Sequence, residues 1–432
     1  MNGITLVALV VTIVVLLILA GVTITMLFGE NGIIKKAQEA KDATERDQQE
    51  TQQGLQDLND QMSTILNGNS GSGTGSGETG DAEPKKVADN IGSVISETEN
   101  TDLTDAYNNK ITIPAGFHIV STSEDSTVSY TYSGNGIPAV QDGIVVADSD
   151  GNQFVWIPVE TIKNADGSTN TIELARYTFD IDVTLDLENE YISVNGTGAV
   201  KNKITDGSSL TDEWVELGGG WEYLEEQETS TTYDNTKAKD IEGFKTSVSQ
   251  NVGYYIARYE ASYRDGTKPY SKASTGTPDD SNGSTITEGM LWNFVTQPDA
   301  ALAARNMYNS SCFESDLVNS YAWDTAIVFI QTYSGDSDYS MQDSLNNNLE
   351  NTGTRDESTT DKVCNIFDMA SNTFEWTTET STYIEDDTRK PCVSRGGNYD
   401  WNMIYYTSNR YNLYSASDRS SNISFRLVLY VQ

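Results

Sequence analysis

An uncharged run close to the N-terminus constrains this chain more than any other feature of its sequence. The 25 residues from Ile4 to Phe28 carry no charged side chain and are mostly Ile, Leu, Val and Thr. A helix rises about 1.5 Å per residue, so this one would measure roughly 37 Å, enough to cross a bilayer with some tilt. A secretory signal peptide has a shorter apolar core followed by a small-residue cleavage site, and neither is visible here. The sequence therefore predicts a retained transmembrane segment.

The stretch "MNGITLVALVVTIVVLLILAGVTITMLFGENGIIKKAQEAK" resembles the N-terminus of the type IV pilin class. In that class a prepilin peptidase cuts after a Gly just before the apolar run, which implies a leader of residues 1–3 and a mature start at Ile4. Pilins usually carry Glu at the fifth mature position, where it supports docking in the filament, and this chain has Ala8 there. A pilin-like filament and a simple membrane anchor therefore both stay open.

The position of the charges next to this run bears on topology. Lys35 and Lys36 follow the apolar segment, which by the positive-inside rule favours a cytoplasmic location for the residues after it. The pilin pattern and the acidity of the following domain favour the opposite orientation. We expect a cell-surface protein with the large domain outside a bacterial-type cell.

The residues after the apolar run predict a stalk and a tether. Residues 29–66 are rich in helix formers and contain no Pro, so we expect a stalk helix there. Residues 67–110 begin with the run "NGNSGSGTGSGETGDAEP" and are predicted to form a flexible linker. The head domain then spans residues 111–432.

Charge and composition exclude several classes of function. Acidic side chains outnumber basic ones 64 to 27, giving a formal net charge of −37, which repels phosphate backbones and argues against nucleic-acid binding. The chain has one His, His118, and three Cys, Cys312, Cys364 and Cys392. These cannot build a multi-His iron site, a Cys/His zinc site or an ordinary Cys–His nucleophile pair. No spacing of the acidic residues picks out a catalytic carboxylate pair.

Downstream of the linker the pattern changes to short strands separated by turns. Strands are predicted in "ITIPAGFHIV", where His118 takes a structural role, in residues 153–160 and in residues 252–262, because these runs are rich in Ile, Val, Tyr and Phe. Helical spacing of apolar residues appears in 286–308 and 318–333, with Trp292 and Trp323 expected in the core. The polar stretch 161–249 is predicted to be an insertion.

Eight motifs of the head occur in an order that resembles the formylglycine-generating-enzyme (sulfatase-modifying factor) family. They are "IPAG", "FVWIPV", "YYIARYEAS", "ARNMY", "YAWDTAIVFI", "NIFDMASNTFEWT", "SRGGNY" and "SFRLVLY". The resemblance implies an α+β head with a variant of the C-type-lectin fold. Enzymes of that family that oxidise a substrate Cys use a copper-binding Cys pair shortly after the Gly-Gly, and here that stretch contains no Cys. We therefore expect the scaffold without the enzyme, and no copper, iron or zinc.

One family feature is retained in part. The run "DMASNTFEW" resembles the calcium-binding turn "D-x-x-G-N-x-W-E-W". Carried over by position, Asp368 and Glu375 would supply side-chain oxygens to Ca²⁺, and Ser371 and Thr373 would supply carbonyls. Ser371 replaces a Gly of the pattern, and the alternative is a structural turn. The same resemblance makes a disulfide between Cys364 and Cys392 plausible.

The segment 398–424 has an unusual composition, with five Tyr, five Asn and six Ser in 27 residues. Tyr, Ser and Asn dominate antibody paratopes because they supply contact area and hydrogen bonds at low entropic cost. The segment is framed by Arg395, Gly396 and Gly397 on one side and by Phe425 and Arg426 on the other. In this setting it resembles the diversified segment of the variable proteins of diversity-generating retroelements.

That resemblance implies a binding face for an unknown protein or surface ligand. The residues expected on it are Asn398, Asp400, Trp401, Asn402, Ile404, Tyr405, Tyr406, Asn409, Tyr411, Asn412, Tyr414 and Ser415. Its aromatic rings should stand exposed, whereas Gly397 and Phe425 should be enclosed. Arg410 and Arg419 are ambiguous, since either could pair with acidic groups. The alternatives are a minor pilin-like structural or adhesion subunit and an unrecognised enzyme.

Overall fold

The computed structural model describes residues 85–186, 191–205, 210–212, 240–278, 283–342, 361–381, 392–398, 406–416 and 418–432. All of them belong to one unit, Ala82–Gln432. The predicted leader, transmembrane segment and stalk lie outside the described residues. Within the described ranges, no helix combines the length and the apolar character needed to span a bilayer.

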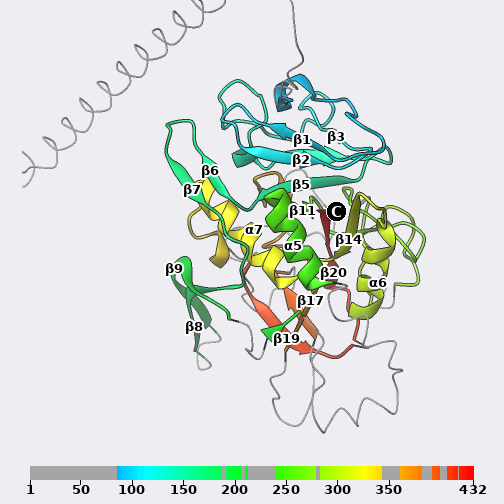
Figure 1. The fold of residues 1–432 in the computed structure, drawn as a ribbon. Coiled ribbons are helices and arrows are strands. Elements are labelled where there is room, and N and C mark those ends of the chain that lie inside the picture. Colours follow the sequence, from blue (N-terminus) through cyan, green and yellow to red (C-terminus); the bar gives the residue numbers. More distant parts are fainter. Residues whose placement is uncertain are drawn as a thin grey trace, which may run out of the picture. The chain divides into compact units, whose positions relative to one another are not determined.

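A six-stranded antiparallel sheet forms the centre of the domain (Figure 1), in the order β14-β21-β11-β5-β4-β3. Its strands are β3 (His118–Ile119), β4 (Val145–Ala147), β5 (Gln153–Pro158), β11 (Gly253–Ala257), β14 (Phe313–Leu317) and β21 (Leu427–Val431). The predicted strands in 153–160 and 252–262 are thereby confirmed as β5 and β11. His118 lies on β3 with its Nε2 2.8 Å from Glu124 Oε1, in keeping with the predicted structural role.

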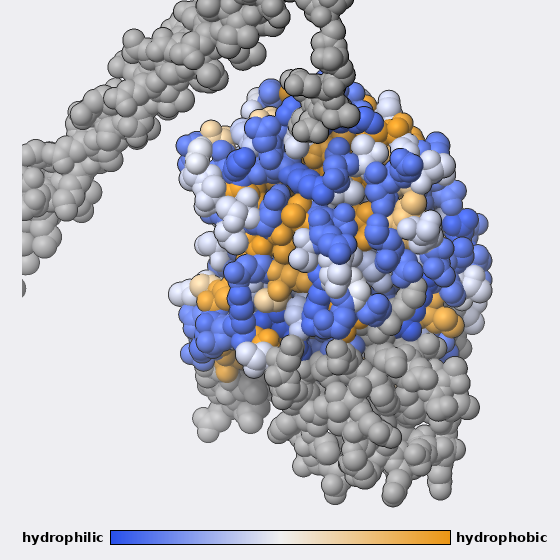
Figure 2. Space-filling view, viewed as in Figure 1, coloured by the Kyte–Doolittle hydropathy of each residue, from blue (hydrophilic) through white to orange (hydrophobic). Residues whose placement is uncertain are grey.

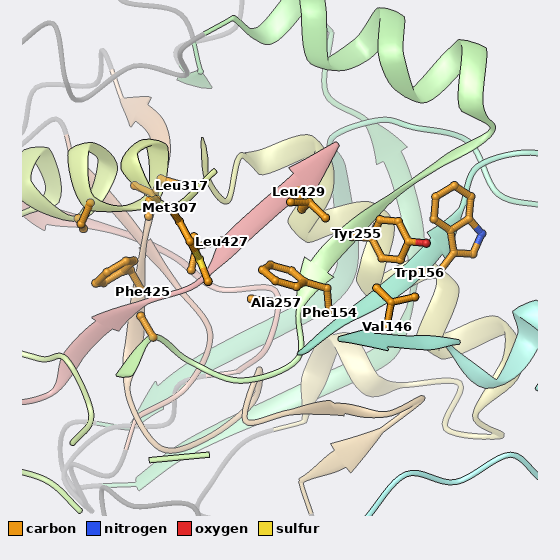
Figure 3. Close-up of a cluster of buried hydrophobic side chains, with 14 of the residues drawn as sticks. Val146, Phe154, Trp156, Tyr255, Ala257, Met307, Leu317, Phe425, Leu427 and Leu429 are labelled. Atoms are coloured by element: carbon orange, nitrogen blue, oxygen red, sulfur yellow. The ribbon is translucent and has the colours of Figure 1, made fainter. Parts of the chain in front are cut away.

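Side chains of the central strands alternate between two hydrophobic clusters, one on each face of the sheet. Phe154, Trp156, Tyr255, Leu427 and Leu429 belong to the first cluster, part of which is drawn in Figure 3. Their neighbours along each strand belong to the second cluster, namely Val155, Ile157, Tyr254, Ile256, Val428 and Tyr430. Successive side chains of a strand point to opposite faces, so a sheet covered on both sides needs an uninterrupted apolar run. The run "LVLYV" meets this requirement at β21.

A second sheet contains the C-terminal segment. It has the order β10-β17-β18-β19, with β20 paired parallel to β17. Its strands are β10 (Leu210–Thr211), β17 (Phe374–Ser381), β18 (Cys392–Arg395), β19 (Arg410–Tyr414) and β20 (Ile423–Phe425). β17 and β19 lie at one end of the domain, and β1 and β2 lie at the opposite end (Figure 1).

Five two-stranded hairpins surround the sheets, together with three short 3₁₀ helices in the described part of the chain. The hairpins pair β1 (Thr101–Thr104) with β2 (Lys110–Ile113), β6 (Thr161–Lys163) with β7 (Thr169–Thr171), β8 (Tyr177–Asp186) with β9 (Tyr191–Lys203), β12 (Ser262–Tyr263) with β13 (Pro269–Tyr270), and β15 (Lys362–Val363) with β16 (Ile366–Phe367). The 3₁₀ helices are η1 (Val87–Asp89), η2 (Val140–Asp142) and η3 (Tyr339–Met341).

The N-terminal boundary of the head differs from the predicted one. Residues 85–110 were expected in the linker, but Val87 and Leu103 are buried and β1 pairs with β2. Val87 and Leu103 are enough to attach this polar stretch to the core, because they pack in the same cluster as Ile111 and Ile113 of the next strand. The head therefore begins before residue 111.

Three α-helices lie in the described ranges: α5 (Ile241–Asn251), α6 (Gln297–Met307) and α7 (Ser320–Tyr333). Asn319 caps α7, its side chain accepting a hydrogen bond from the Ala322 amide, which confirms the predicted helix in 318–333. Helix α6 begins later than the apolar spacing suggested, because Thr296 caps it and Pro298 stands in its first turn. Trp292 and Val295 thus precede the helix, although both are buried.

Helix α5 overlaps the stretch 161–249 that was predicted to be an insertion, yet it belongs to the core. Its Phe244 ring packs edge-on against Tyr254 of β11 and Tyr430 of β21, with ring centroids 5.5 Å apart in both pairs. The architecture is mixed, with three helices and mostly antiparallel sheets in the part of the chain that the structure covers. The C-type-lectin assignment stays a prediction. The face shown in Figure 2 is mostly hydrophilic, with a narrow hydrophobic strip near its middle.

Candidate functional site

The structure describes seven of the twelve residues predicted on the binding face. Tyr406, Asn409, Tyr411, Asn412, Tyr414 and Ser415 are half-buried, so the rings are less exposed than predicted. Asn398 is 1% exposed, so its side chain is not presented to a ligand in this structure. Asp400, Trp401, Asn402, Ile404 and Tyr405 lie outside the described residues.

A β-bulge in β19 determines which side each of its residues faces. Ser394 of β18 is opposite Tyr411, whereas Cys392 is opposite Tyr414. Two steps along β18 therefore match three steps along β19, which means that β19 carries one extra residue. In a regular strand, residues three apart point to opposite faces. The extra residue places Tyr411 and Tyr414 on the same face.

These two rings rest on a buried aromatic base supplied by β17. Tyr411 stacks on Phe374 with centroids 5.5 Å apart and an interplanar angle of 9°. Tyr414 meets Trp376 edge-on at 5.3 Å, and the two Tyr rings lie 5.5 Å apart at 61°. Phe374 and Trp376 are 1% and 0% exposed, and the Trp376 Nε1–H donates to the Val295 carbonyl at 2.9 Å. Such contacts add about 0.5–1.5 kcal/mol per pair beyond area burial and hold the outer rings in place.

The opposite face of β18 and β19 carries a buried charge cluster of Arg395, Arg410, Asp324 and Glu379. Arg395 stands directly across from Arg410 in the register, an arrangement of like charges that is unfavourable unless it is compensated. Asp324 and Glu379 compensate it, because each carboxylate accepts from both guanidinium groups. Arg410 Nε lies 2.9 Å and 3.1 Å from the two Glu379 oxygens, and Arg395 Nη1 lies 3.2 Å from Glu379 Oε2.

Both Arg side chains also donate to backbone carbonyls, which ties separate segments together. Arg410 Nη1 donates to the Tyr177 carbonyl of β8 at 3.1 Å, and Arg395 Nε donates to the Asn409 carbonyl at 2.8 Å. Burial alone would lower the pKa of Arg410, but Asp324 and Glu379 outweigh it and raise that pKa. Burial and the neighbouring Arg410 lower the pKa of Arg395. We treat both groups as charged, since an Arg guanidinium stays protonated in proteins.

The framework residues named from the sequence are placed as predicted where the structure describes them. Phe425 is fully buried and Gly397 is buried. Gly396 has φ +83°, and a Cβ there would lie 2.6 Å from the Met369 carbonyl oxygen, so only Gly fits. Trp323 of α7 is also fully buried, confirming its predicted core position, and its Nε1–H donates to the Thr407 carbonyl at 2.9 Å.

The turn predicted to bind calcium is held by protein groups. Glu375 accepts from Arg426 on both carboxylate oxygens, with Arg426 Nε 2.6 Å from Oε2. Ser371 donates to Asp361, and the Thr373 hydroxyl donates to Glu260 at 2.7 Å. Asp368 is buried with φ +61°. The Arg426 guanidinium thus occupies both carboxylate oxygens of Glu375. Glu375 therefore does not fit as a calcium ligand in this arrangement.

Among the residues that the structure describes, no group of three or more His, Cys, Asp or Glu side chains is placed to hold a metal ion. Calcium at this turn therefore stays a prediction from the resemblance. The alternative that the sequence left open was a structural turn in which Glu375 and Asn372 bond the backbone. The structure shows hydrogen bonds at this turn, but Glu375 bonds the Arg426 side chain and Asn372 the Glu260 side chain.

The expected disulfide between Cys364 and Cys392 is not formed, and all three Cys are free thiols. Cys364 lies in the two-residue turn between β15 and β16 and packs against the second hydrophobic cluster. Cys392 lies on β18 within the first cluster. The two thiols therefore pack into different hydrophobic clusters. Burial raises the pKa of Cys364 to about 12, which keeps it protonated.

Sequence reasoning missed Phe374, Trp376, Asp324 and Glu379. The alternation in "TFEWT" was a usable signal, because it places Phe374 and Trp376 on one face of a strand and Glu375 on the other. Asp324 had no local signal, since it stands in the apolar helix α7 and meets Arg395 across 71 residues of sequence.

Comparisons with known proteins give no family for this chain. Neither the scan against protein-family models nor the search of curated proteins found a match. Among solved structures, the crystal structure of CarF matches with a TM-score of 0.26 and 14% sequence identity, over 42% of this chain and 87% of the CarF chain. A similarity at that TM-score carries no argument about fold or function.

Proposed function

We propose that this chain is a surface-displayed ligand-binding protein whose binding face is built around Tyr411 and Tyr414. The observation that supports the proposal best is the pair of half-buried Tyr rings, turned to one side by a bulge and seated on the buried rings of Phe374 and Trp376. Aromatic side chains held rigidly at a surface are typical anchors of binding interfaces. The neighbouring Tyr406, Asn409, Asn412 and Ser415 supply polar groups that adapt to a partner.

The position of the proposed binding face is compatible with display away from an N-terminal anchor. The face lies at the end of the domain with β17 and β19, opposite the end with β1 and β2, near which the described chain begins (Figure 1). We therefore include in the proposal an anchor formed by residues 4–28, with the head outside the cell. The resemblance to retroelement variable proteins adds the proposal that residues of the face differ between copies of the gene.

The ligand is proposed to be neutral or basic. A net charge of −37 repels acidic partners and attracts basic ones over several ångströms. Tyr rings bind hydrocarbon surfaces, amide groups and the cationic ends of Lys and Arg. No catalytic step is part of the proposal.

The test is binding of the full-length protein, in detergent micelles, to a panel of whole bacterial cells and phage particles. We expect the double variant Tyr411→Ser, Tyr414→Ser to lose at least about 30-fold in affinity, because the loss of even one aromatic anchor often costs about 2 kcal/mol or more. Tyr107 and Tyr132 provide a matched control, since they are also half-buried and in edge-on contact, with centroids 5.7 Å apart. The double variant Tyr107→Ser, Tyr132→Ser should stay within about threefold of the original affinity.

Two results would contradict the proposal. Equal losses of affinity in both double variants would mean that any surface Tyr contributes non-specifically to binding. Unchanged binding after loss of Tyr411 and Tyr414 would place the ligand elsewhere. A melting temperature measured for each variant distinguishes a lost contact from a lost fold.

A further inference from the structure

Arg410 stands next to Tyr411 in the segment but points the other way. Adjacent residues of a strand face opposite sides, so the guanidinium enters the charge cluster while the Tyr ring lies on Phe374. The side chain of Arg410 is 14% exposed and its partner carboxylates are fully buried. The sequence left the role of this Arg ambiguous, and the contacts identify it as an inward-facing group.

The bulge after Arg410 requires something to hold it. A bulge interrupts the hydrogen-bonded ladder, and a slip of one residue turns every side chain of a strand to the other face. In β19 such a slip would exchange the sides of the Tyr rings and of Arg410. Such a slip would also remove the aromatic contacts, because it brings Arg410 or Asn412, and not a Tyr, to the place of Tyr411 over Phe374.

The contacts of Arg410 in the charge cluster form in only one register of β19. Moving β19 by one residue would shift Arg410 by about 3.3 Å and break its contacts with Glu379, Asp324 and the Tyr177 carbonyl. Two buried carboxylates would then share Arg395 alone. Breaking a buried ion pair from one side is strongly destabilising, and the best-attested use of buried charges is to specify register.

We propose that Arg410 is the positioning residue of the binding face: held between Asp324 and Glu379, it sets the register in which β19 enters the bulge and so points Tyr411 toward Phe374, while the bulge brings Tyr414 to the same side. The backbone of β19 is then fixed. Asn412, Tyr411 and Tyr414 can contact a ligand, or differ between gene copies, without a change in that backbone. The consequence for ligand affinity rests on the proposed function, whereas the consequence for the conformation of β19 does not.

Hydrogen–deuterium exchange of the full-length protein in detergent micelles tests the proposal. We compare Arg410→Met with Arg305→Met, because the Arg305 side chain is also 14% exposed and is ion-paired at 2.8 Å, to Asp316. In Arg410→Met we expect amides of residues 410–416 to exchange at least about tenfold faster, with β5 and β11 unchanged. Arg410→Lys keeps one charge but not the fork, so it should restore part of the protection. Arg305→Met should leave residues 410–416 as they were.

The proposal is overturned if exchange at 410–416 is unchanged in Arg410→Met, or if Arg305→Met accelerates it equally. It is also overturned if all strands accelerate together in both Arg410 variants, because Arg410 then acts only on general stability. If Arg410→Met does not fold, the Lys variant decides alone, by whether faster exchange is confined to 410–416. Ligand affinity is measured in parallel. A local change in exchange without a change in affinity supports the positioning role and counts against the proposed function.

Discussion

Glu260 is a buried carboxyl group whose hydrogen bonds come from Asn372 and Thr373. Its oxygens accept hydrogen bonds from the Thr373 amide and hydroxyl at 3.0 Å and 2.7 Å and from the Asn372 amide group. Burial, followed by the charges of Glu375 and Asp368, raises the pKa of Glu260 well above its ordinary value. Arg426 acts in the opposite direction on this pKa, but its guanidinium is ion-paired with Glu375.

This raised pKa predicts a pH-dependent stability. In the unfolded chain Glu260 ionises near pH 4.3, whereas the folded protein keeps it protonated to higher pH. The stability that this group contributes is thus fully present below the unfolded pKa and is lost as the pH rises above it. Glu260→Gln cannot ionise, so its melting temperature relative to the original protein should increase as the pH rises above about 4.5. The exposed Glu242 of α5 supplies the control Glu242→Gln. A difference that does not depend on pH would contradict the prediction.

At the scale of elements, α7 supports the segment with the proposed binding face, because Trp323 contacts Thr407 and Asp324 contacts Arg410. The helix begins at Ser320 under the cap of Asn319, whose Oδ1 accepts from the Ala322 amide at 2.9 Å. Asn319 is 2% exposed, so an amide left without this acceptor would have little access to water. The start of α7 is therefore sensitive to this one side chain.

Asn319→Ala should reduce the free energy of unfolding by about 1–2 kcal/mol, measured by denaturant titration, and Asn319→Ser should restore most of it. Thr296→Ala removes the corresponding cap of α6, where the hydroxyl accepts from the Asp299 amide at 3.3 Å. It should cost about 1 kcal/mol. Only Asn319→Ala should also speed amide exchange at Thr407 and Arg410, which contact α7. The same local effect from Thr296→Ala would show that α7 has no special role.

At the scale of the whole molecule, the excess of acidic groups is the dominant electrostatic feature. The formal charge of −37 makes the folded chain repel itself, and this repulsion is screened as the Debye length falls from about 30 Å at 0.01 M salt to about 3 Å at 1 M. Many of the attractive pairs, such as Arg395 with Asp324, are buried and are screened far less.

We therefore expect NaCl to stabilise the protein. The melting temperature should rise by about 2 °C or more between 0.02 M and 0.5 M NaCl, a shift that corresponds to roughly 1 kcal/mol for a domain of moderate size. Exchanging part of the NaCl for CaCl₂ or MgCl₂ at equal ionic strength separates screening from specific binding. A fall in melting temperature with NaCl would mean that exposed attractive pairs such as Arg264 with Asp150 outweigh the repulsion.

Much of the fold could be predicted from local patterns. The run "GYYIA" predicts a strand because it is rich in Tyr and Ile, and the structure distributes Tyr254 and Tyr255 to opposite clusters. Gly396 stands where a turn brings two backbones together, which a Gly in sequence already suggests. The start of α6 was misjudged because apolar spacing continued past Trp292, although Thr296 and Pro298 marked the true beginning.

The sequence by itself determined the strands β5 and β11, the helix α7 and the segment rich in Tyr, Asn and Ser, because strand-forming composition and helical spacing are properties of neighbouring residues. Only the tertiary structure decided which side of that segment is presented. The bulge of β19, the burial of Asn398 and the partners of Arg410 depend on groups far away in the chain, with Asp324 86 residues and Glu379 31 residues from Arg410. An Arg in a polar segment turns inward only where buried carboxylates can pair with it. The positions of those carboxylates are set by tertiary packing.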